Sequence, residues 1–200
     1  MQDQQNEQGE ERRELNELMA VRRDKLKAIS DLGIDPFGQK FVSTHQAQEI
    51  VDNFDSLEAE ETALAGRLMS MRTHGKASFA DLMDSSGRIQ LYFRINTLGE
   101  EGYEFLQKLD IGDIVGIKGR VFKTRRGEIS VEVKELKLLA KSLRPLPEKW
   151  HGLKDVDLRY RQRYLDLIVN PKVRRVFETR SKIIQSLRDF LIQKGYIEVE

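Results

Sequence analysis

Two side chains that can recognise an unpaired nucleic-acid base stand in neighbouring segments, Phe79 in KASFADLMD and Gln90 in RIQLYFRI. Both segments alternate apolar and polar residues as a half-buried strand does, which puts Phe79 and Gln90 on the outer face. An exposed ring stacks on a base, a fixed amide reads a base's hydrogen-bonding edge, and arginines hold phosphates. The pattern therefore predicts a surface that binds single-stranded nucleic acid. The inner positions are Ala80, Leu82, Ile89, Leu91, Phe93 and Ile95.

The turn between these two segments decides whether their outer faces coincide. A two-residue turn at 85–86 keeps the alternation of both strands and sets Phe79 opposite Tyr92 and Asp81 opposite Gln90. The same parity also fits a cross-strand Phe–Tyr pair that only stiffens the sheet. Two further outer positions of the second segment are arginines, Arg88 and Arg94.

A basic loop, KTRRG (123–127), contains Arg125 and Arg126 and is followed by Glu128. Glu128 has the opposite parity to Ile129, so we expect it on the outer face. It can form an ion pair with the neighbouring cations, or accept a hydrogen bond from the N–H of an exposed base. Phosphate contacts by the loop arginines would make binding weaken as salt rises.

A helical apolar period runs from Arg12 to Gly33, behind a polar tail at 1–11. Its polar face carries four cations, which either face solvent or contact phosphates. They are Arg22, Arg23, Lys25 and Lys27. A second short helix and a linker are predicted within 45–60.

Five strands and one helix are predicted between residues 61 and 142. The strands are 63–73, 76–84, 88–95, 113–124 and 128–139, and the helix at 100–109 lies between the third and fourth. This order is typical of the five-stranded OB-fold barrel, whereas an SH3-like barrel lacks a helix at this point. The predicted fold class is α+β, mainly β.

After the barrel we expect a connector with a short helix (143–170), in which 155–168 is helical. Asn170 and Pro171 then supply an N-cap and a first helical residue. A long helix should run from there to Gly195, followed by a strand at 196–200. Because a terminal strand needs a sheet to join, we expect the chain to be the front part of something longer, or to pair with another chain. The predicted domains are 1–60, 61–142, 143–170 and 171–200.

Composition excludes several functions. The chain has no cysteine and its three histidines stand far apart, so we predict no metal site. It has no Walker A loop, no G-x-G-x-x-G and no legible Ser/His/Asp arrangement, so we predict no catalytic residue. The polar N-terminus and the lack of a long apolar stretch indicate a cytoplasmic protein without a membrane partner.

Charge is distributed unevenly although the formal net charge is only +1. Residues 1–65 carry 7 basic and 15 acidic side chains (net −8), residues 66–140 carry 13 and 10 (net +3), and residues 141–200 carry 14 and 8 (net +6). A polyanionic partner should therefore contact the later two-thirds of the chain.

Four quoted segments together resemble bacterial lysyl-tRNA synthetase of class II. They are GKASFADLMDSSGRIQLYF, LDIGDIVGIKGRVFKTRRGEISV, LRPLPEKWHGLKDVDLRYRQRYLDLI and GYIEVE. The aspartyl and asparaginyl enzymes share the barrel, the Phe and the Gln, but resemble this chain less in the N-terminal helix and in HGL…RYRQRYLDL.

The resemblance implies roles for individual residues. Phe79 would stack on an anticodon base of tRNA(Lys), Gln90 and Arg72 would contact the central uridine, and Glu128 would contact a neighbouring base. The four cations of the N-terminal helix would add nonspecific affinity for tRNA. The segment 171–200 would be the first class II motif, at a homodimer interface.

The resemblance also implies an enzyme that uses ATP and Mg²⁺ to activate lysine and then esterifies it to tRNA, with no DNA partner. Motifs 2 and 3 of that family are absent here, so the chain as given is predicted inactive. Alternatives are an aspartyl- or asparaginyl-type synthetase, a free-standing OB protein that binds single strands, and a purely structural dimerisation module.

Overall fold

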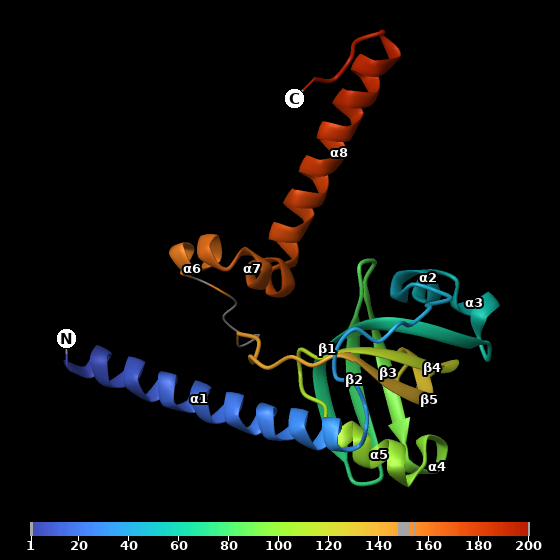
Figure 1. Cartoon of the computed structure of the whole chain (residues 1–200). Helices are drawn as coiled ribbons and strands as arrows, with labels where there is room; N and C mark the ends of the chain where they lie inside the picture. Colours follow the sequence, from blue (N-terminus) through green and yellow to red (C-terminus); the bar gives the residue numbers. More distant parts are fainter. Residues whose placement is uncertain (1, 148–152, 154, 200) are drawn as a thin grey trace. The chain divides into compact units, whose positions relative to one another are not determined.

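The computed structural model describes residues 2–147, 153 and 155–199, with the backbone alone for residues 2–12 and 74. The chain forms two compact units, residues 1–145 and 146–200 (Figure 1). Part of the predicted connector, residues 148–152 and 154, lies outside the described residues.

A closed five-stranded barrel forms the main body of the first unit, as the sequence predicts. Its strands are β1 (Glu61–His74), β2 (Ala77–Met83), β3 (Arg88–Arg94), β4 (Ile114–Lys123) and β5 (Ile129–Ala140). They follow one another around the barrel in the order β1-β2-β3-β5-β4, and all neighbours are antiparallel except β3 and β5. Each strand boundary lies within two residues of the prediction, because inside–outside alternation marks a barrel strand along its whole length.

The barrel interior is filled by the apolar residues that alternation predicts. Ala80 and Leu82 of β2 and Leu91 and Phe93 of β3 are fully buried. Complete burial of a large apolar side chain such as that of Phe93 contributes about 1.5–3 kcal/mol to folding. Because the inner residues of β2 and β3 pack in this core, their outer residues are the ones that can make contacts outside the barrel.

Two helices, α4 (Ile95–Leu98) and α5 (Glu100–Gln107), lie between β3 and β4 and cover one end of the barrel (Figure 1). The side chain of Tyr103 in α5 is buried, and its hydroxyl lies 2.8 Å from the Ser78 hydroxyl. The Tyr103 hydroxyl also donates to the carbonyl of Gly75 at 3.1 Å. The helix is thereby attached to the start of β2.

At the other end of β3, Asp84 joins the β2–β3 turn to α2 (Ala47–Asp52), which is followed by α3 (Phe54–Leu57). Its carboxylate accepts hydrogen bonds from the backbone N–H groups of Ser86 (2.7 Å), Gly87 (2.9 Å) and Ala47 (2.7 Å). Burial raises the pKa of Asp84, but these hydrogen bonds outweigh it and hold the pKa below its usual value.

The N-terminal helix α1 (Gln2–Asp31) is longer than predicted, because residues 2–11 are helical instead of forming a polar tail. Gln and Glu, which dominate this stretch, are good helix formers and continue the hydrogen-bond ladder of the residues that follow. The helix ends where predicted, with Gly33 in the left-handed region (φ 75°). Near that end Ile29 is fully buried in the barrel core cluster.

The second unit contains α6 (Val156–Arg161), α7 (Arg163–Val169) and α8 (Pro171–Gln193). The single helix predicted over 155–168 is wrong, because the backbone breaks at Gln162 (φ −117°, ψ 57°). The break lets Arg159 of α6 and Arg163 of α7 both reach the buried carboxylate of Asp166.

The long helix α8 and its end at Gly195 (φ 83°) confirm the prediction, but two details differ. Asn170 occupies the N-cap position, yet its side chain donates to Asp166 Oδ1 at 2.6 Å and forms no cap hydrogen bond. The strand predicted at 196–200 is not formed by its described residues, 196–199. A strand is stable only when it pairs with another, and no described segment pairs with this one.

Candidate nucleic-acid interface

The β2–β3 hairpin confirms the predicted register. Phe79 pairs with Tyr92 and Asp81 with Gln90, across a turn at 85–86. Phe79 and Gln90 therefore lie on the same outer face of the barrel, both half-buried. Neither side chain enters the barrel interior, so both can take part in a surface site.

Three aromatic rings lie together on this face. Phe79 stacks on Tyr92 with ring centroids 4.7 Å apart and planes 22° apart. Tyr92 in turn contacts Phe122 of β4 at 5.7 Å and 45°. The sheet-stiffening pair is thus present, and such pairs contribute about 0.5–1.5 kcal/mol. It also holds the half-exposed ring of Phe79 in place, as a stacking platform requires.

Phe122 is a member of this site that sequence reasoning missed. It lies on β4, yet its ring contacts Tyr92 on β3 although β5 runs between these strands. The intervening position is Ser130, which pairs with Phe122 and is buried. The small serine leaves room for two rings to meet above it. Alternation along β4 could have indicated it, because Val121 points into the barrel and the next residue, Phe122, therefore points outward.

Gln90 is held in place by the same serine. The Ser130 hydroxyl donates to the side-chain oxygen of Gln90 at 3.0 Å. The amide is thus anchored on the outer face and its N–H groups remain as donors. Arg72 of β1 is exposed and pairs in register with Phe79, so the structure brings Arg72, Phe79 and Gln90 onto one face.

Glu128, Arg125 and Arg126 are exposed in the hairpin between β4 and β5. Gly127 has a φ of 86°, which a residue with a side chain rarely adopts, and its N–H donates to the Thr124 carbonyl at 2.8 Å. Glu128 lies just before β5 and two residues before Ser130, so the two residues have the same parity along the strand. In the described part of the chain Glu128 forms no ion pair, so the local ion pair considered above is not made.

The two outer arginines of β3 are engaged by carboxylates. Arg88 forms an ion pair with Asp81, and Arg94 lies 3.5 Å from Glu132. Asp81 is almost buried and also accepts from the Ser70 hydroxyl. Arg88 and Arg94 are the first and last residues of β3, so each end of this strand carries an arginine that is paired with a carboxylate.

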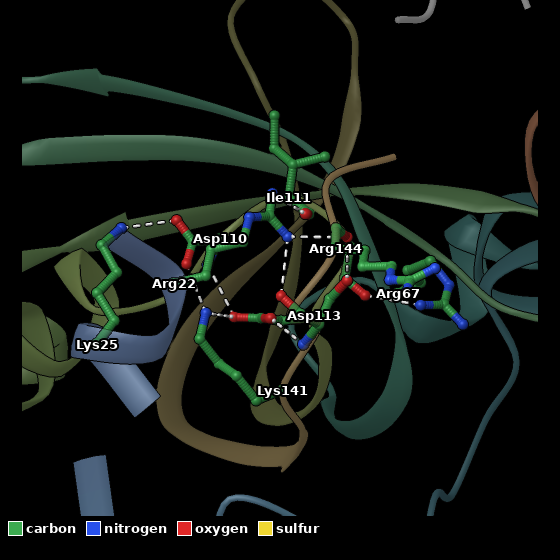
Figure 2. A network of polar contacts seen from close by, with 10 residues as sticks. Arg22, Lys25, Arg67, Asp110, Ile111, Asp113, Lys141 and Arg144 are labelled. Carbon is green, nitrogen blue, oxygen red and sulfur yellow. Dashed lines mark hydrogen bonds and ion pairs between the residues drawn. The ribbon is translucent and has the colours of Figure 1, made fainter. Parts of the chain in front are cut away.

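The four cations of α1 do not share one environment. Arg22 is buried, and its guanidinium donates to the carbonyls of Ser142 (2.9 Å), Arg144 (3.3 Å) and Ile111 (2.9 Å) (Figure 2). Lys25 lies 2.6 Å from Asp110. These two cations are bound within the molecule because α1 docks on the barrel through their face. Arg23 and Lys27 are the exposed members of the set.

Asp110 and Asp113 anchor this docking site. The ammonium of Lys141 lies 2.5 Å from Asp110 and 2.8 Å from Asp113, and the side chains of Lys141 and Asp113 are fully buried. Burial raises the pKa of Asp110, but its contacts with Lys141 and Lys25 outweigh this and lower the pKa below its usual value.

Two protein families match this chain. Residues 62–139 match the OB-fold nucleic acid binding domain, and these residues are almost the whole span of β1 to β5. Residues 155–200 match the tRNA synthetases of class II (D, K and N) and include α6, α7 and α8.

Similar proteins cover nearly the whole chain. The lysine–tRNA ligase of Moorella thermoacetica is 63% identical over 185 residues, 92% of this chain and 38% of that protein. Those of Pelotomaculum thermopropionicum and Carboxydothermus hydrogenoformans are 59% and 58% identical over 94% and 95% of this chain. The chain is thus similar over nearly its whole length to a part of these lysine–tRNA ligases.

The chain spans less than two-fifths of the length of the lysine–tRNA ligases it matches. Its aromatic surface lies inside the segment that matches the OB-fold nucleic acid binding domain. No described helix is both long and apolar enough to cross a membrane.

Proposed function

We propose that the barrel binds the uridine-rich anticodon loop of tRNA(Lys) on the outer face of β1, β2 and β3. The observation that carries this proposal is the placement of Arg72, Phe79 and Gln90 on one exposed face, with the amide of Gln90 anchored by Ser130. The homology to lysine–tRNA ligases supports the choice of tRNA(Lys) over other single strands.

Each side chain has a role in this proposal. Phe79 stacks on an anticodon base, while Arg72 and Gln90 contact the central uridine. Glu128 accepts a hydrogen bond from a neighbouring base, which its exposed position just before β5 allows. Arg125 and Arg126, in the same hairpin, contact phosphates.

The whole protein, in this proposal, activates lysine with ATP and Mg²⁺ in the cytoplasm and esterifies it to the bound tRNA. Among the described residues there is no group of three or more His, Asp or Glu side chains that could hold a metal ion. We therefore give none of them a role in binding ATP or Mg²⁺. In this proposal, the 200 residues of this chain contribute the selection of the tRNA to the reaction of the whole protein.

The second unit contributes to a homodimer of the whole enzyme in this proposal. The helix α8 exposes a series of large apolar side chains that its own unit leaves uncovered. They include Val176, Ile183, Leu187 and Phe190. An apolar face of this kind is typical of a surface that a partner covers.

A binding competition with RNA hairpins tests the anticodon assignment. The 200-residue chain is titrated with hairpins that differ only in the loop, which carries either three uridines or the anticodon of tRNA(Asp) or tRNA(Asn). We expect the uridine loop to bind most tightly. Equal affinity for all three loops would contradict the assignment to tRNA(Lys), and tighter binding of the second or third would favour an aspartyl- or asparaginyl-type enzyme.

A further inference from the structure

One face of α1 is docked on the barrel and carries two cations, Arg22 and Lys25, that are bound to groups of the barrel unit. Arg22, Lys25 and Ile29 are spaced by three and four residues, so they lie on the same side of the helix. Arg22 is 8% exposed and Ile29 is fully buried. Arg23 and Lys27 are exposed to solvent. The helix therefore has a docking face and, next to it, a free basic surface.

Arg22 joins α1 to two other segments of the chain at once. One nitrogen of its guanidinium donates to the carbonyls of Ser142 and Arg144, in the segment that leaves β5 (Figure 2). The other terminal nitrogen donates to the carbonyl of Ile111, in the loop between α5 and β4. A planar guanidinium can donate to two segments at once through its two terminal nitrogens, whereas a lysine ammonium is a single point of charge.

The same two segments are fastened to each other beneath α1. Lys141 contacts both Asp110 and Asp113, and the backbone N–H of Ser142 donates to Asp113 Oδ1 at 2.7 Å. Lys25 adds an ion pair from α1 to Asp110. A buried charge that loses its partner destabilises the folded chain. The cluster therefore favours the one position of α1 on the barrel in which these charges stay paired.

We infer that Arg22 is a positioning residue for RNA binding. It contacts no phosphate, and it holds α1 on the barrel so that Arg23 and Lys27 meet the RNA backbone at a fixed place. A loosely attached helix would have to be ordered during binding, which reduces affinity, whereas a docked helix is already in place. This inference rests on the proposed function, since it concerns the affinity of the chain for RNA.

The first experiment measures docking without RNA, in the full 200-residue chain. Arg22→Met removes the guanidinium, and Arg13→Met, at an exposed arginine of the same helix, is the matched charge control. The amides of Lys141 and Ser142 donate to Pro36 and Asp113, so their hydrogen exchange reports on the docking site. We expect exchange about tenfold faster in Arg22→Met, as loss of a charge-assisted hydrogen bond produces, and no change in Arg13→Met. Protected amides of β2 and β3 verify that the barrel is folded.

The second experiment measures affinity for a hairpin RNA with a uridine-rich loop. We expect Arg22→Met to weaken binding about as much as the double variant Arg23→Gln/Lys27→Gln, and more than Arg13→Met.

A cross-link tests whether docking alone restores the affinity. Because the chain has no cysteine, Lys25→Cys and Asp110→Cys can be joined by a short bis-maleimide. In the Arg22→Met chain this cross-link should restore most of the affinity without restoring the charge. The same cysteine variants without the linker, and with Arg22 retained, are the controls.

Three results would overturn the inference. Unchanged exchange in Arg22→Met would show that Arg22 does not hold α1. Undocking without loss of affinity would show that docking does not serve RNA binding. A cross-linked chain that stays docked but binds weakly would show that the charge of Arg22 itself contacts RNA. Failure of the wild-type chain to bind any hairpin would overturn the proposed function as well.

Discussion

Ser130 of β5 donates a hydrogen bond to the side-chain oxygen of Gln90 of β3, at 3.0 Å, across a parallel pair of strands. One lone pair of the amide oxygen is thereby used, while both N–H groups of Gln90 remain as donors for an RNA base. Uracil presents carbonyl acceptors, whereas cytosine presents an amino group in the place of one of them. We therefore expect an amide held in this orientation to favour uridine.

Replacing Ser130 with alanine should reduce the preference for uridine. The freed amide can rotate and present its oxygen to the cytosine amino group, so we expect the ratio of affinities for uridine and cytidine loops to fall severalfold. Loss of the hydrogen bond should also lower the free energy of unfolding by about 0.5–1.5 kcal/mol. Binding to the two loops and urea unfolding measure the two effects. Ser56→Ala, at an exposed serine of α3, is the control, and an unchanged ratio in Ser130→Ala would show that Ser130 does not orient Gln90.

Replacing Phe79 with alanine separates the two interpretations of the aromatic pair. If Phe79 stacks on a base, binding to the uridine-rich hairpin should weaken by about 1–3 kcal/mol. Loss of the contact with Tyr92 should cost about 0.5–1.5 kcal/mol of stability in either case. Phe79→Tyr keeps the ring and should retain both properties. A less stable chain with unchanged RNA affinity would mean that the pair only stiffens the sheet.

Most of the barrel and part of the site could be predicted from the sequence because they depend on neighbours in the chain. Parity along β2 and β3, with a two-residue turn between them, is enough to place Phe79 and Gln90 on one face. Phe122 could not be placed in the same way. Its contact with Tyr92 depends on the order β3-β5-β4 around the barrel, which nothing local in the sequence specifies.

The contacts of Arg22 could not be predicted for a related reason. Its partners Ser142, Arg144 and Ile111 are 120, 122 and 89 residues away, so the helical pattern shows only a cation on a polar face. The break at Gln162 could not be predicted because it depends on the carboxylate of Asp166, which binds Arg159 of α6, Arg163 of α7 and Asn170 between α7 and α8. Helical spacing alone favours one continuous helix.

Neutralising the hairpin arginines should change the salt dependence of RNA binding and not its base preference. Each single-strand phosphate contact contributes about 0.7 to the slope of log affinity against log salt, so Arg125→Gln/Arg126→Gln should flatten the slope by about 1.4. Titrations of the uridine and cytidine hairpins at several salt concentrations give both quantities. Arg180→Gln/Lys182→Gln makes the same change in charge in the second unit, on α8, and is the control. A changed base preference in the hairpin variant would mean that these arginines contact bases.

The carboxylate of Asp84 should make the barrel less stable in acid. Because its pKa is lowered in the folded chain, it binds a proton more readily in the unfolded chain. Its contribution to stability is therefore complete above the unfolded pKa of about 3.9 and is lost as the pH falls through the lower folded pKa.

The variant Asp84→Asn tests this prediction. It keeps the shape of the side chain but removes the charge that accepts hydrogen bonds from Ser86, Gly87 and Ala47. We expect the variant to be less stable than the wild type at pH 7 and the difference to narrow below about pH 4. Urea unfolding followed through the amide NMR signals of β2 and β3 measures the difference at each pH, and a constant difference from pH 7 to pH 3 would mean that the charge of Asp84 does not stabilise the turn.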